Sequence, residues 1–401
     1  MNTVYVIDAI RTPVGKHGGS LATVRPDDLL AHVLKVLIER NPKVDVNAIE
    51  DVIAGAANQA GEDNRNVARM AALMAGLPVS VGGNTVNRLC ASGLQAVMDA
   101  SRAIMCGDGE VFIACGVESM TRAPFVMAKA ESPYQRKVEV FDTSIGWRFI
   151  NNKLSSLHYP YVMGETAENV AERWNVTREE QDKFALQSQE RYFAAKASGK
   201  FSEEITPVTV DLGKGKTMVF DTDEHPRETS LEKLAALMPA FKKDGTVTAG
   251  NSSGVNDGAA AILLASEEAV KKYGLRPMAK ITSMAIAGVD PAVMGVGPVP
   301  ATLKALKRAG LTISDLDLVE LNEAFASQGI ACMRDLSLEG AKVNVNGGSI
   351  AIGHPLGCSG VRISTTLLYE LRRRNARYGL ATMCIGVGQG AAVIYENLQT
   401  Q

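Results

Sequence analysis

Short apolar runs rich in β-branched residues alternate along the chain with segments whose apolar positions recur at helical spacing. The first run covers residues 4–10, and residues 26–39 follow it with leucine, valine and isoleucine on one helical face. Further runs predict strands at residues 52–54, 111–114, 260–264, 281–286, 318–321, 343–345, 380–384 and 391–395. Helices fit between most of these strands, so the pattern predicts an α/β fold.

The middle of the chain interrupts this alternation. Residues 121–250 hold 37 of the 86 charged residues in under a third of the length, with turns rich in proline, glycine and lysine. Two charged helices are predicted there, near residues 166–174 and 178–198. We interpret this part as a segment that lies outside the hydrophobic core of the α/β fold.

Two segments far apart in the chain have similar sequences. The motif at residues 90–93 opens a helix that leads to a strand ending near Cys115, 23 positions after Ser92. The motif at residues 357–360 opens another that leads to Cys384, 25 positions after Ser359. This internal similarity predicts a duplicated fold with two related halves.

Length and charge narrow the class of protein. A chain of 401 residues exceeds what one hydrophobic core usually organises. The net charge is −2 and the basic residues are scattered, so neither a nucleic-acid nor a membrane partner is expected. Met1 leads directly into an apolar run without a signal-like segment, which predicts a cytoplasmic protein. Six cysteines without a CxxC pair argue against a zinc site or a disulfide scaffold.

One cysteine stands where an extended segment gives way to a predicted helix. Residues 83–89 form the extended segment, Cys90 follows, and the helix is expected over residues 91–105. A thiol at a helix N-terminus faces unpaired N–H groups and the positive end of the helix dipole, which favours the thiolate and lowers the pKa. Cys90 is therefore a candidate nucleophile, and a packed core thiol is the alternative that position alone leaves open.

Two glycine-rich segments near the C-terminus carry further candidate groups. His354 lies in a loop over residues 346–357, where a fixed histidine can act as a base near neutral pH. Cys384 ends a predicted strand, and the N–H groups of the glycines after it can serve as oxyanion-hole donors. The segment over residues 386–390 lacks the lysine and hydroxyl residue of a phosphate loop, which excludes a nucleotide site of that kind.

Asn322 stands at the junction between a predicted strand and a following helix. An asparagine at this position commonly caps the helix. Its amide can instead point into a site and hold a water molecule. Both interpretations stay open at this point.

Four of these segments, in this order and at this spacing, resemble the signature segments of thiolases. They are residues 87–93, 322–325, 353–357 and 384–390. The similarity extends to residues 9–13, 166–170 and 248–254, and so spans nearly the whole chain. A single match would be weak, whereas four ordered matches are specific.

The resemblance implies a five-layered αβαβα fold made of two similar βαβαβαββ halves with an inserted loop domain. It divides the chain into an N-terminal half (residues 1–120 and 250–273), an inserted loop domain that binds coenzyme A and substrate (121–249) and a C-terminal half (274–401). It also implies a homotetramer assembled as a dimer of dimers.

The same resemblance implies a role for each candidate group. Cys90 would carry the acyl group as a thioester, and His354 would activate its thiol. Cys384 would exchange a proton with the substrate α-carbon. Asn322 would hold a water beside His354 in one oxyanion hole, and Gly386 with the Cys90 N–H would form the other. Two cysteines with different tasks suit this chemistry, since an enolate needs both a nearby base and aimed donors.

Coenzyme A and acyl-CoA enter as substrates by this resemblance, with no permanently bound cofactor and no metal. Arg227 would meet the nucleotide end of coenzyme A, although composition alone makes it a solvated charge. The pantetheine tunnel would be lined by Met163, Ala249, Ser253 and Phe325.

The implied activity is that of an acetyl-CoA C-acyltransferase, which interconverts acyl-CoA and acetyl-CoA with 3-oxoacyl-CoA and CoA, in fatty-acid β-oxidation or aromatic degradation. Val162 stands where short-chain biosynthetic members have a histidine, which disfavours a dedicated acetoacetyl-CoA thiolase. Residues 141–149 and Cys358 resemble 3-oxoadipyl-CoA thiolases, but Gly164 departs from the proline of that subgroup. Arg148 is either a partner for a terminal carboxylate or a structural arginine.

Two other classes of function share this scaffold. A decarboxylating ketoacyl synthase would use one cysteine with two histidines or a histidine and an asparagine, and Cys384 followed by glycines argues against it. A non-catalytic lipid or coenzyme A carrier would be expected to have lost at least one chemical group, and all four are present.

Overall fold

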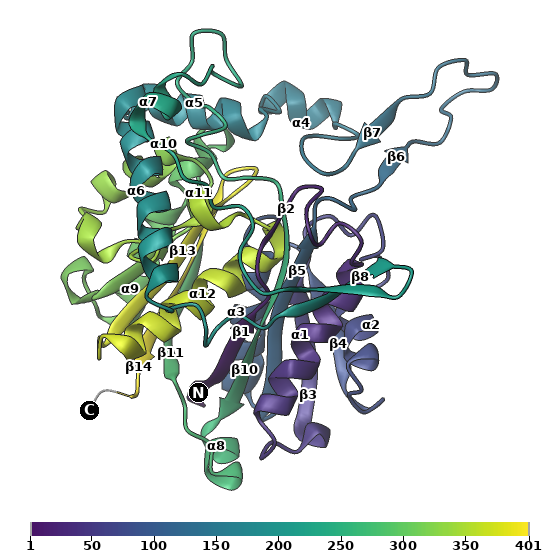
Figure 1. Cartoon of the computed structure of the whole chain (residues 1–401), viewed down its shortest axis with the longest axis vertical. Helices are drawn as coiled ribbons and strands as arrows, with labels where there is room; N and C mark the ends of the chain where they lie inside the picture. The colour runs from purple at the N-terminus through teal and green to yellow at the C-terminus, as the bar shows by residue number, and fades with distance from the viewer. Residues whose placement is uncertain (1, 400–401) are drawn as a thin grey trace.

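The computed structural model describes residues 2–399, and its main strands form one large mixed sheet of two parts (Figure 1). Five strands of one part lie in the order β1, β10, β5, β3, β4, and four strands of the other lie in the order β11, β14, β13, β12. The bounds of the first part are β1 Val4–Arg11, β10 Asn256–Ser266, β5 Val111–Ser119, β3 Ile49–Gly55 and β4 Gly82–Val86, with the short β2 (Gly15–Lys16) beside β10. Those of the second are β11 Ala279–Gly288, β14 Gln389–Asn397, β13 Tyr378–Ile385 and β12 Leu318–Leu321.

Both parts of the sheet repeat one strand order. In each part the first strand pairs antiparallel with the last, β1 with β10 and β11 with β14. The next strand, β5 or β13, is again antiparallel, and β3 or β12 beyond it is parallel. β1 and β11 join the two parts through the pairs Tyr5 with Lys280 and Val6 with Ala279. The duplicated fold predicted from the internal similarity is therefore confirmed.

Helices cover both faces of each part of the sheet. α3 (Ser92–Cys106) and α12 (Leu356–Arg373) lie together in the middle and share one core with both parts (Figure 1). α1 (Pro26–Arg40) and α2 (Val67–Met74) cover the outer face of the first part, while α9 (Pro298–Ala309) and α10 (Ala326–Asp335) cover that of the second. β5 and β10 are buried at every residue because helices lie on both of their faces. These are the five layers expected from the sequence.

One predicted strand, residues 343–345, does not form. Only an isolated bridge joins Val343 to Val319 of β12. The cause is Asn344, whose φ of 47° lies in the left-handed region and breaks an extended run. Its side chain replaces the missing ladder, because Oδ1 accepts from the Leu321 N–H at 2.9 Å and Nδ2 donates to the Leu321 carbonyl at 2.8 Å.

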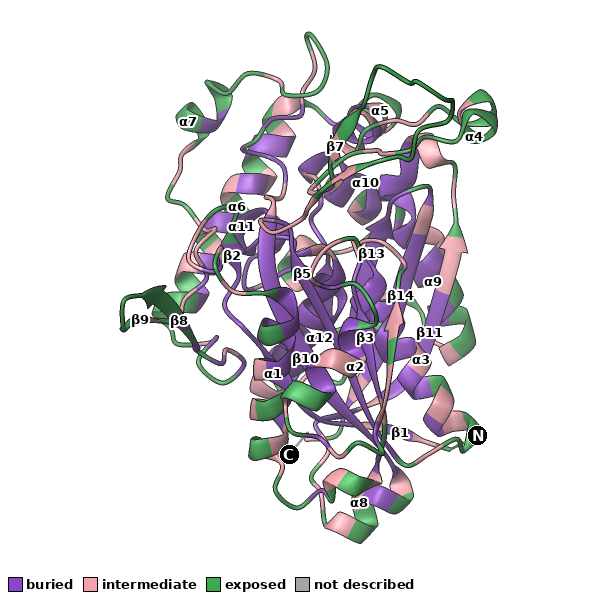
Figure 2. Cartoon of the chain, turned by 90° about the vertical axis from the view of Figure 1, so that its right-hand side faces the viewer, coloured by how far each residue is buried: buried purple, intermediate pink, exposed green. Residues whose placement is uncertain are grey.

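The charged middle of the chain lies outside the sheet, along the top of Figure 1 and at one side. Its elements are β6 Phe125–Met127, β7 Val140–Asp142, α4 Asn152–Leu157, α5 Met163–Arg173, α6 Arg178–Ala197, β8 Val208–Gly213, β9 Lys216–Phe220 and α7 Leu231–Ala235. Two of them, α5 and α6, match the charged helices that the sequence predicts, and α6 begins with a capping box between Thr177 and Glu180. Much of this region is exposed, whereas the sheet beneath it is buried (Figure 2).

The remaining helices are short connections. They are α8 Glu267–Tyr273, α11 Ser349–Ile352 and the 3₁₀ turns Val46–Ala48, Pro291–Val296, Ile313–Asp315 and Gly340–Lys342. Within residues 2–399, none of the helices has the length and apolar character needed to cross a membrane. The same residues contain no group of three or more side chains arranged to hold a metal ion.

Candidate active site

Cys90 lies in a tight bend between β4 and α3. Leu89, just before it, has a φ of 47°, a strained conformation for a leucine. Side chains on both sides hold the bend, since Asn87 Oδ1 accepts from the Leu89 N–H at 2.8 Å and Ser92 Oγ donates to the Leu89 carbonyl at 2.7 Å. The bend turns Cys90 toward a cavity of about 430 Å³.

The thiol of Cys90 is not the preformed thiolate expected from its place before a helix. Burial raises its pKa to about 11, and the backbone N–H groups of Gly386 and of Cys90 itself lower it only in part. The expectation of a lowered pKa is therefore wrong for this structure. The free energy needed to remove the thiolate charge from water is larger than the stabilisation that the helix end and the two N–H groups give to that charge.

His354 is buried, and its hydrogen bonds decide which ring nitrogen carries the proton. Nδ1 lies 2.6 Å from Ser359 Oγ, and that hydroxyl also lies 2.8 Å from the Pro355 carbonyl, which can only accept. The serine proton therefore goes to Pro355, and Nδ1–H donates to the serine oxygen. Nε2 is left with its lone pair, which is the form required of a base.

A buried network fixes the other side of the imidazole. Arg362 Nη2 can only donate, and it does so to Ser349 Oγ at 2.7 Å. Ser349 then donates to Asn322 Oδ1 at 2.6 Å, which turns the Asn322 amide nitrogen toward His354 Nε2 at 3.4 Å. Asn322 is thus part of the site, and the interpretation of its side chain as a helix cap is wrong, because α10 begins later, after Phe325.

The His354 imidazole is neutral over the physiological range. Burial lowers its pKa to about 3, and the positive charge of Arg362 contributes in the same direction. A neutral imidazole can accept a proton, whereas an imidazolium cannot.

Cys384 is fully buried at the end of β13. Burial raises the pKa of its thiol well above the usual value, and the nearby Cys90 adds to this shift. It packs in a small apolar cluster with Met294 and Ala324, against which Met163 and Phe325 lie. A thiol in such surroundings holds its proton until a strong base, such as a carbanion, takes it.

Close contact between two glycine-containing turns brings the halves of the site together. A side chain at Gly93 would place its Cβ 2.6 Å from the Gly357 carbonyl, and one at Gly360 would place it 2.1 Å from the Leu94 nitrogen. Both glycines belong to the two similar motifs, so the helices that follow Cys90 and His354 cross where they begin. Leu356, two residues after His354, consequently lines the Cys90 cavity.

Glu118 lines the same cavity and was missed in the sequence. Its carboxylate accepts from the N–H groups of Ala57, Asn58 and Gly357 at 2.9, 3.2 and 2.8 Å, so it ties β5 to the loop after His354. Burial raises its pKa to about 7 although these donors lower it. The sequence signal that could have identified Glu118 is an acidic residue within the otherwise apolar run that forms β5.

The residues expected to bind coenzyme A form a second connected group. Arg227 is exposed, and its Nη2 donates to the Ala249 carbonyl at 2.6 Å. The Ser253 N–H donates to the carbonyl of Ala324, the residue before Phe325, at 2.9 Å. Met163 lies near Phe325 and also lines the Cys90 cavity. Arg227 thus contacts Ala249, while Met163 and Phe325 pack beside Cys384 and Met163 also lines the Cys90 cavity.

Comparisons with known proteins identify the family of this chain. The family description "Thiolase, N-terminal domain" matches residues 4–268, and "Thiolase, C-terminal domain" matches residues 275–397. A curated relative from Escherichia coli, named 3-oxoadipyl-CoA/3-oxo-5,6-dehydrosuberyl-CoA thiolase, is 56% identical over 99% of this chain and 100% of its own length. A 3-ketoacyl-CoA thiolase from Aeromonas hydrophila is 48% identical over 99% of this chain and 100% of its own.

Solved structures share the whole fold. The Bacillus anthracis acetyl-CoA acetyltransferase superposes with a TM-score of 0.94 at 42% identity, covering 99% of both chains. Human mitochondrial 3-ketoacyl-CoA thiolase in complex with CoA does so with a TM-score of 0.91 at 44% identity, covering 99% of this chain and 98% of that one. The chain therefore belongs to the thiolase family. It is an acyltransferase.

Proposed function

We propose that this thiolase cleaves 3-oxoacyl-CoA with CoA, through an acyl-thioester on Cys90. In the first half, His354 Nε2 takes the Cys90 thiol proton, and the sulfur attacks the 3-oxo carbon. The bond between C2 and C3 breaks, and the Cys384 thiol protonates the acetyl-CoA enolate. The acyl group stays on Cys90 as a thioester.

In the second half, the Cys384 thiolate takes the proton of the CoA thiol. The CoA sulfur attacks the acyl group on Cys90, and acyl-CoA forms. Cys90 leaves as a thiolate and regains its proton from His354. Cys90 thus recovers its own proton through His354, the Cys384 proton leaves in acetyl-CoA and is replaced by that of the CoA thiol, and the same steps in reverse give the Claisen condensation.

The observation that carries this proposal is the proton placement at His354. Ser359 holds Nδ1–H, so the bare Nε2 presents its lone pair as a proton acceptor, and the oxyanion donors must stabilise the product of the transfer from the Cys90 thiol. Asn322 beside Nε2 can orient a water as one oxyanion donor. The N–H groups of Gly386 and Cys90, which point at the Cys90 sulfur, supply the second pair of donors for the thioester oxygen.

We assign coenzyme A to the path from Arg227 to the two cysteines, as a substrate. The Arg227 guanidinium, exposed and anchored on Ala249, would meet the nucleotide phosphates. Ala249, Ser253, Met163 and Phe325 would line the pantetheine arm, whose amides need few polar partners. In this assignment the chain segments 1–120 with 250–273, 121–249 and 274–401 act as the N-terminal half, inserted loop domain and C-terminal half.

Variants of the two cysteines test the mechanism. Cys90→Ala should abolish thiolysis of 3-oxoacyl-CoA, while Cys106→Ala, which changes an exposed thiol at the end of α3, should leave it unchanged. Cys384→Ala should still form the acyl-thioester at Cys90 with acyl-CoA, detected by mass spectrometry, yet fail to exchange the α-protons of acetyl-CoA. Unchanged turnover in Cys90→Ala would contradict the nucleophile. Proton exchange at the wild-type rate in Cys384→Ala would contradict the acid/base role.

For the acyl group we propose a dicarboxylic substrate of the 3-oxoadipyl-CoA type, cleaved to succinyl-CoA and acetyl-CoA in aromatic degradation. The relatives named for this substrate are 54–57% identical to the chain, compared with 48% for the 3-ketoacyl-CoA thiolase. Rates with 3-oxoadipyl-CoA, a straight-chain 3-oxoacyl-CoA and acetoacetyl-CoA test this choice. A cytoplasmic location stays a prediction of the sequence.

We also propose that the chain forms a homotetramer. The β6–β7 hairpin projects from the body of the molecule (Figure 1) and carries apolar residues that a monomer would leave in water. Phe125, Met127, Val138 and Val140 are 74%, 66%, 66% and 56% exposed. A second copy of the chain would cover them.

A further inference from the structure

Arg148 brings a cation without an acidic partner to the cavity of Cys90. It lines this cavity together with Leu89, Ile145 and Leu356. Its Nη2 donates to Asn58 Oδ1 at 3.2 Å, and among residues 2–399 no carboxylate oxygen lies within 4.0 Å of its guanidinium. A guanidinium has five N–H donors, so most of them are free for a ligand.

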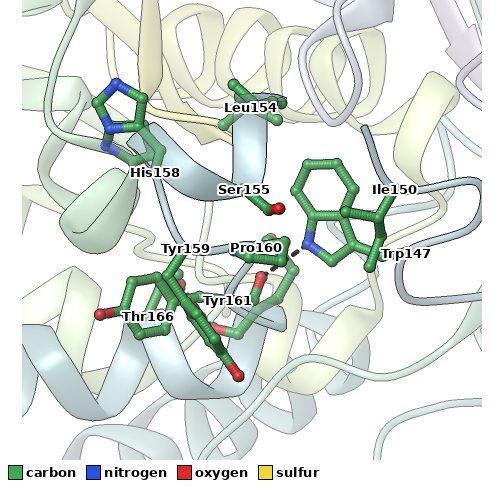
Figure 3. Close-up of a pocket in the computed structure, with 12 residues that line it drawn as sticks. Trp147, Ile150, Leu154, Ser155, His158, Tyr159, Pro160, Tyr161 and Thr166 are labelled. Atoms are coloured by element: carbon green, nitrogen blue, oxygen red, sulfur yellow. Dashed lines mark hydrogen bonds between the residues drawn. The ribbon is translucent and has the colours of Figure 1, made fainter. Parts of the chain in front are cut away.

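The backbone around Arg148 is held in place. The preceding Trp147 donates from Nε1 to the Tyr161 carbonyl at 2.9 Å, the dashed contact in Figure 3. Its indole lines a small pocket together with Ile150, Leu154 and Tyr161 (Figure 3), and Trp147 also lines the Cys90 cavity. A bulky side chain fixed in this way leaves the next residue little freedom.

The partner of Arg148 is held as firmly. Asn58 Nδ2 donates to Thr143 Oγ1 at 3.0 Å, and the Asn58 N–H donates to Glu118 Oε1 at 3.2 Å. Asn58 thus links the segment around Arg148 to β5 at the floor of the site. Asn58 Oδ1 is neutral, so it orients the guanidinium without neutralising its charge.

Glu118 is the one acidic side chain lining the cavity among the residues that the structure describes. Its oxygens already accept three backbone N–H groups, which leaves it a poor partner for a cation across the cavity. The positive charge of Arg148 therefore faces a largely apolar space next to the nucleophile. Arg148 is only partly buried and keeps some contact with water, and a ligand carboxylate in the cavity would pair with its charge.

We propose that Arg148 is the specificity-determining residue of this thiolase, and that its guanidinium binds the free carboxylate at the far end of a dicarboxylic acyl chain. This inference rests on the proposed function, because it assumes an acyl group on Cys90. After cleavage of 3-oxoadipyl-CoA that group is succinyl, a short chain with a carboxylate at its end. A planar guanidinium binds a carboxylate through two parallel hydrogen bonds, which a methyl end group cannot form.

The test compares two substrates of equal chain length, 3-oxoadipyl-CoA and 3-oxohexanoyl-CoA, which carries a methyl group in place of the carboxylate. Wild type should prefer 3-oxoadipyl-CoA in kcat/KM. Arg148→Ala should lose on the order of 100-fold toward 3-oxoadipyl-CoA and change by less than about threefold toward 3-oxohexanoyl-CoA. Lys153→Ala, which removes an exposed cation from nearby α4, is the matched control and should keep the wild-type ratio.

Activity toward 3-oxohexanoyl-CoA also reports whether the variant folds. If Arg148→Ala is inactive with both substrates, Arg148→Lys and Arg148→Gln test the role of the charge instead. The lysine variant should keep part of the preference for 3-oxoadipyl-CoA over 3-oxohexanoyl-CoA, and the glutamine variant should lose it. If wild type prefers 3-oxoadipyl-CoA and Arg148→Ala loses activity equally toward both substrates, the role of Arg148 is overturned while the proposed substrate stands. A wild type without this preference would overturn the dicarboxylic substrate and, with it, the carboxylate subsite.

Discussion

Hydrogen-bond direction at single residues decides what His354 can do. Arg362 can only donate and the Pro355 carbonyl can only accept, so the protons between them are ordered. This order runs through Ser349 and Asn322 on one side of the imidazole and through Ser359 on the other. The sequence placed His354 and Asn322 in the site, but not Ser359, whose role depends on a contact across one helical turn.

Replacing Ser359 tests the proton placement. In Ser359→Ala the Nδ1–H loses its acceptor, so the tautomer with the proton on Nε2 becomes populated and the base is lost. We expect kcat to fall roughly 10- to 100-fold with little change in KM. Ser364→Ala is the control, because Ser364 is also buried in α12 and donates to a carbonyl four residues earlier, but does not touch His354. Equal losses in both variants would contradict the proposed role.

The pH dependence of the wild type follows from the same residue. The folded pKa of His354 is about 3, below the usual value of 6.5, so the imidazole stays neutral as the pH falls until it approaches 3. His354 should therefore contribute no acid limb near pH 6.5 to the profile of kcat/KM while the protein stays folded, whereas Glu118 in the Cys90 cavity, with a pKa of about 7, titrates in this range. An acid limb at that pH, absent from Ser359→Ala, would show that His354 titrates normally.

At the scale of elements, α3 and α12 place the two halves of the chemistry side by side. Their first turns cross at Gly93 and Gly360, where the backbones approach too closely for a side chain. The sequence similarity between these motifs predicted related halves. It did not predict that the two motifs would contact each other, because packing between distant segments leaves no local pattern.

A methyl group at this crossing should push the helices apart. Gly360→Ala would set Cβ 2.1 Å from the Leu94 nitrogen, so we expect a loss of about 1–3 kcal/mol in the free energy of unfolding together with reduced kcat. Gly340→Ala is the matched control, since its nearest neighbour is the tip of Met333 at 3.5 Å, an ordinary contact. Denaturant unfolding and turnover measure both effects. A Gly360→Ala protein as stable and active as the control would show that the crossing has room.

At the scale of the whole molecule, the exposed β6–β7 hairpin indicates assembly. We expect light scattering on a size-exclusion column to give about four times the chain mass of 42.7 kDa. A double variant, Phe125→Asp with Val138→Asp, should lower this mass because charges in a buried contact are costly. Lys153→Asp, on the surface of α4, should leave it unchanged. A monomer for the wild type would contradict the tetramer.

The sequence by itself determined the elements and the identities of the reacting groups. The apolar runs predict eight of the nine main strands of the large sheet, but not the short strands β2, β6, β7, β8 and β9. The surroundings of Cys90, His354 and Cys384 indicate their chemistry, because both kinds of signal depend on neighbours along the chain. The tertiary structure alone decided the raised pKa of Cys90, the proton order at His354 and the position of Arg148 in the cavity. The burial of Cys90 and the approach of Arg148 depend on residues far apart in the sequence, and the proton order at His354 depends on side-chain orientations that a local pattern does not record.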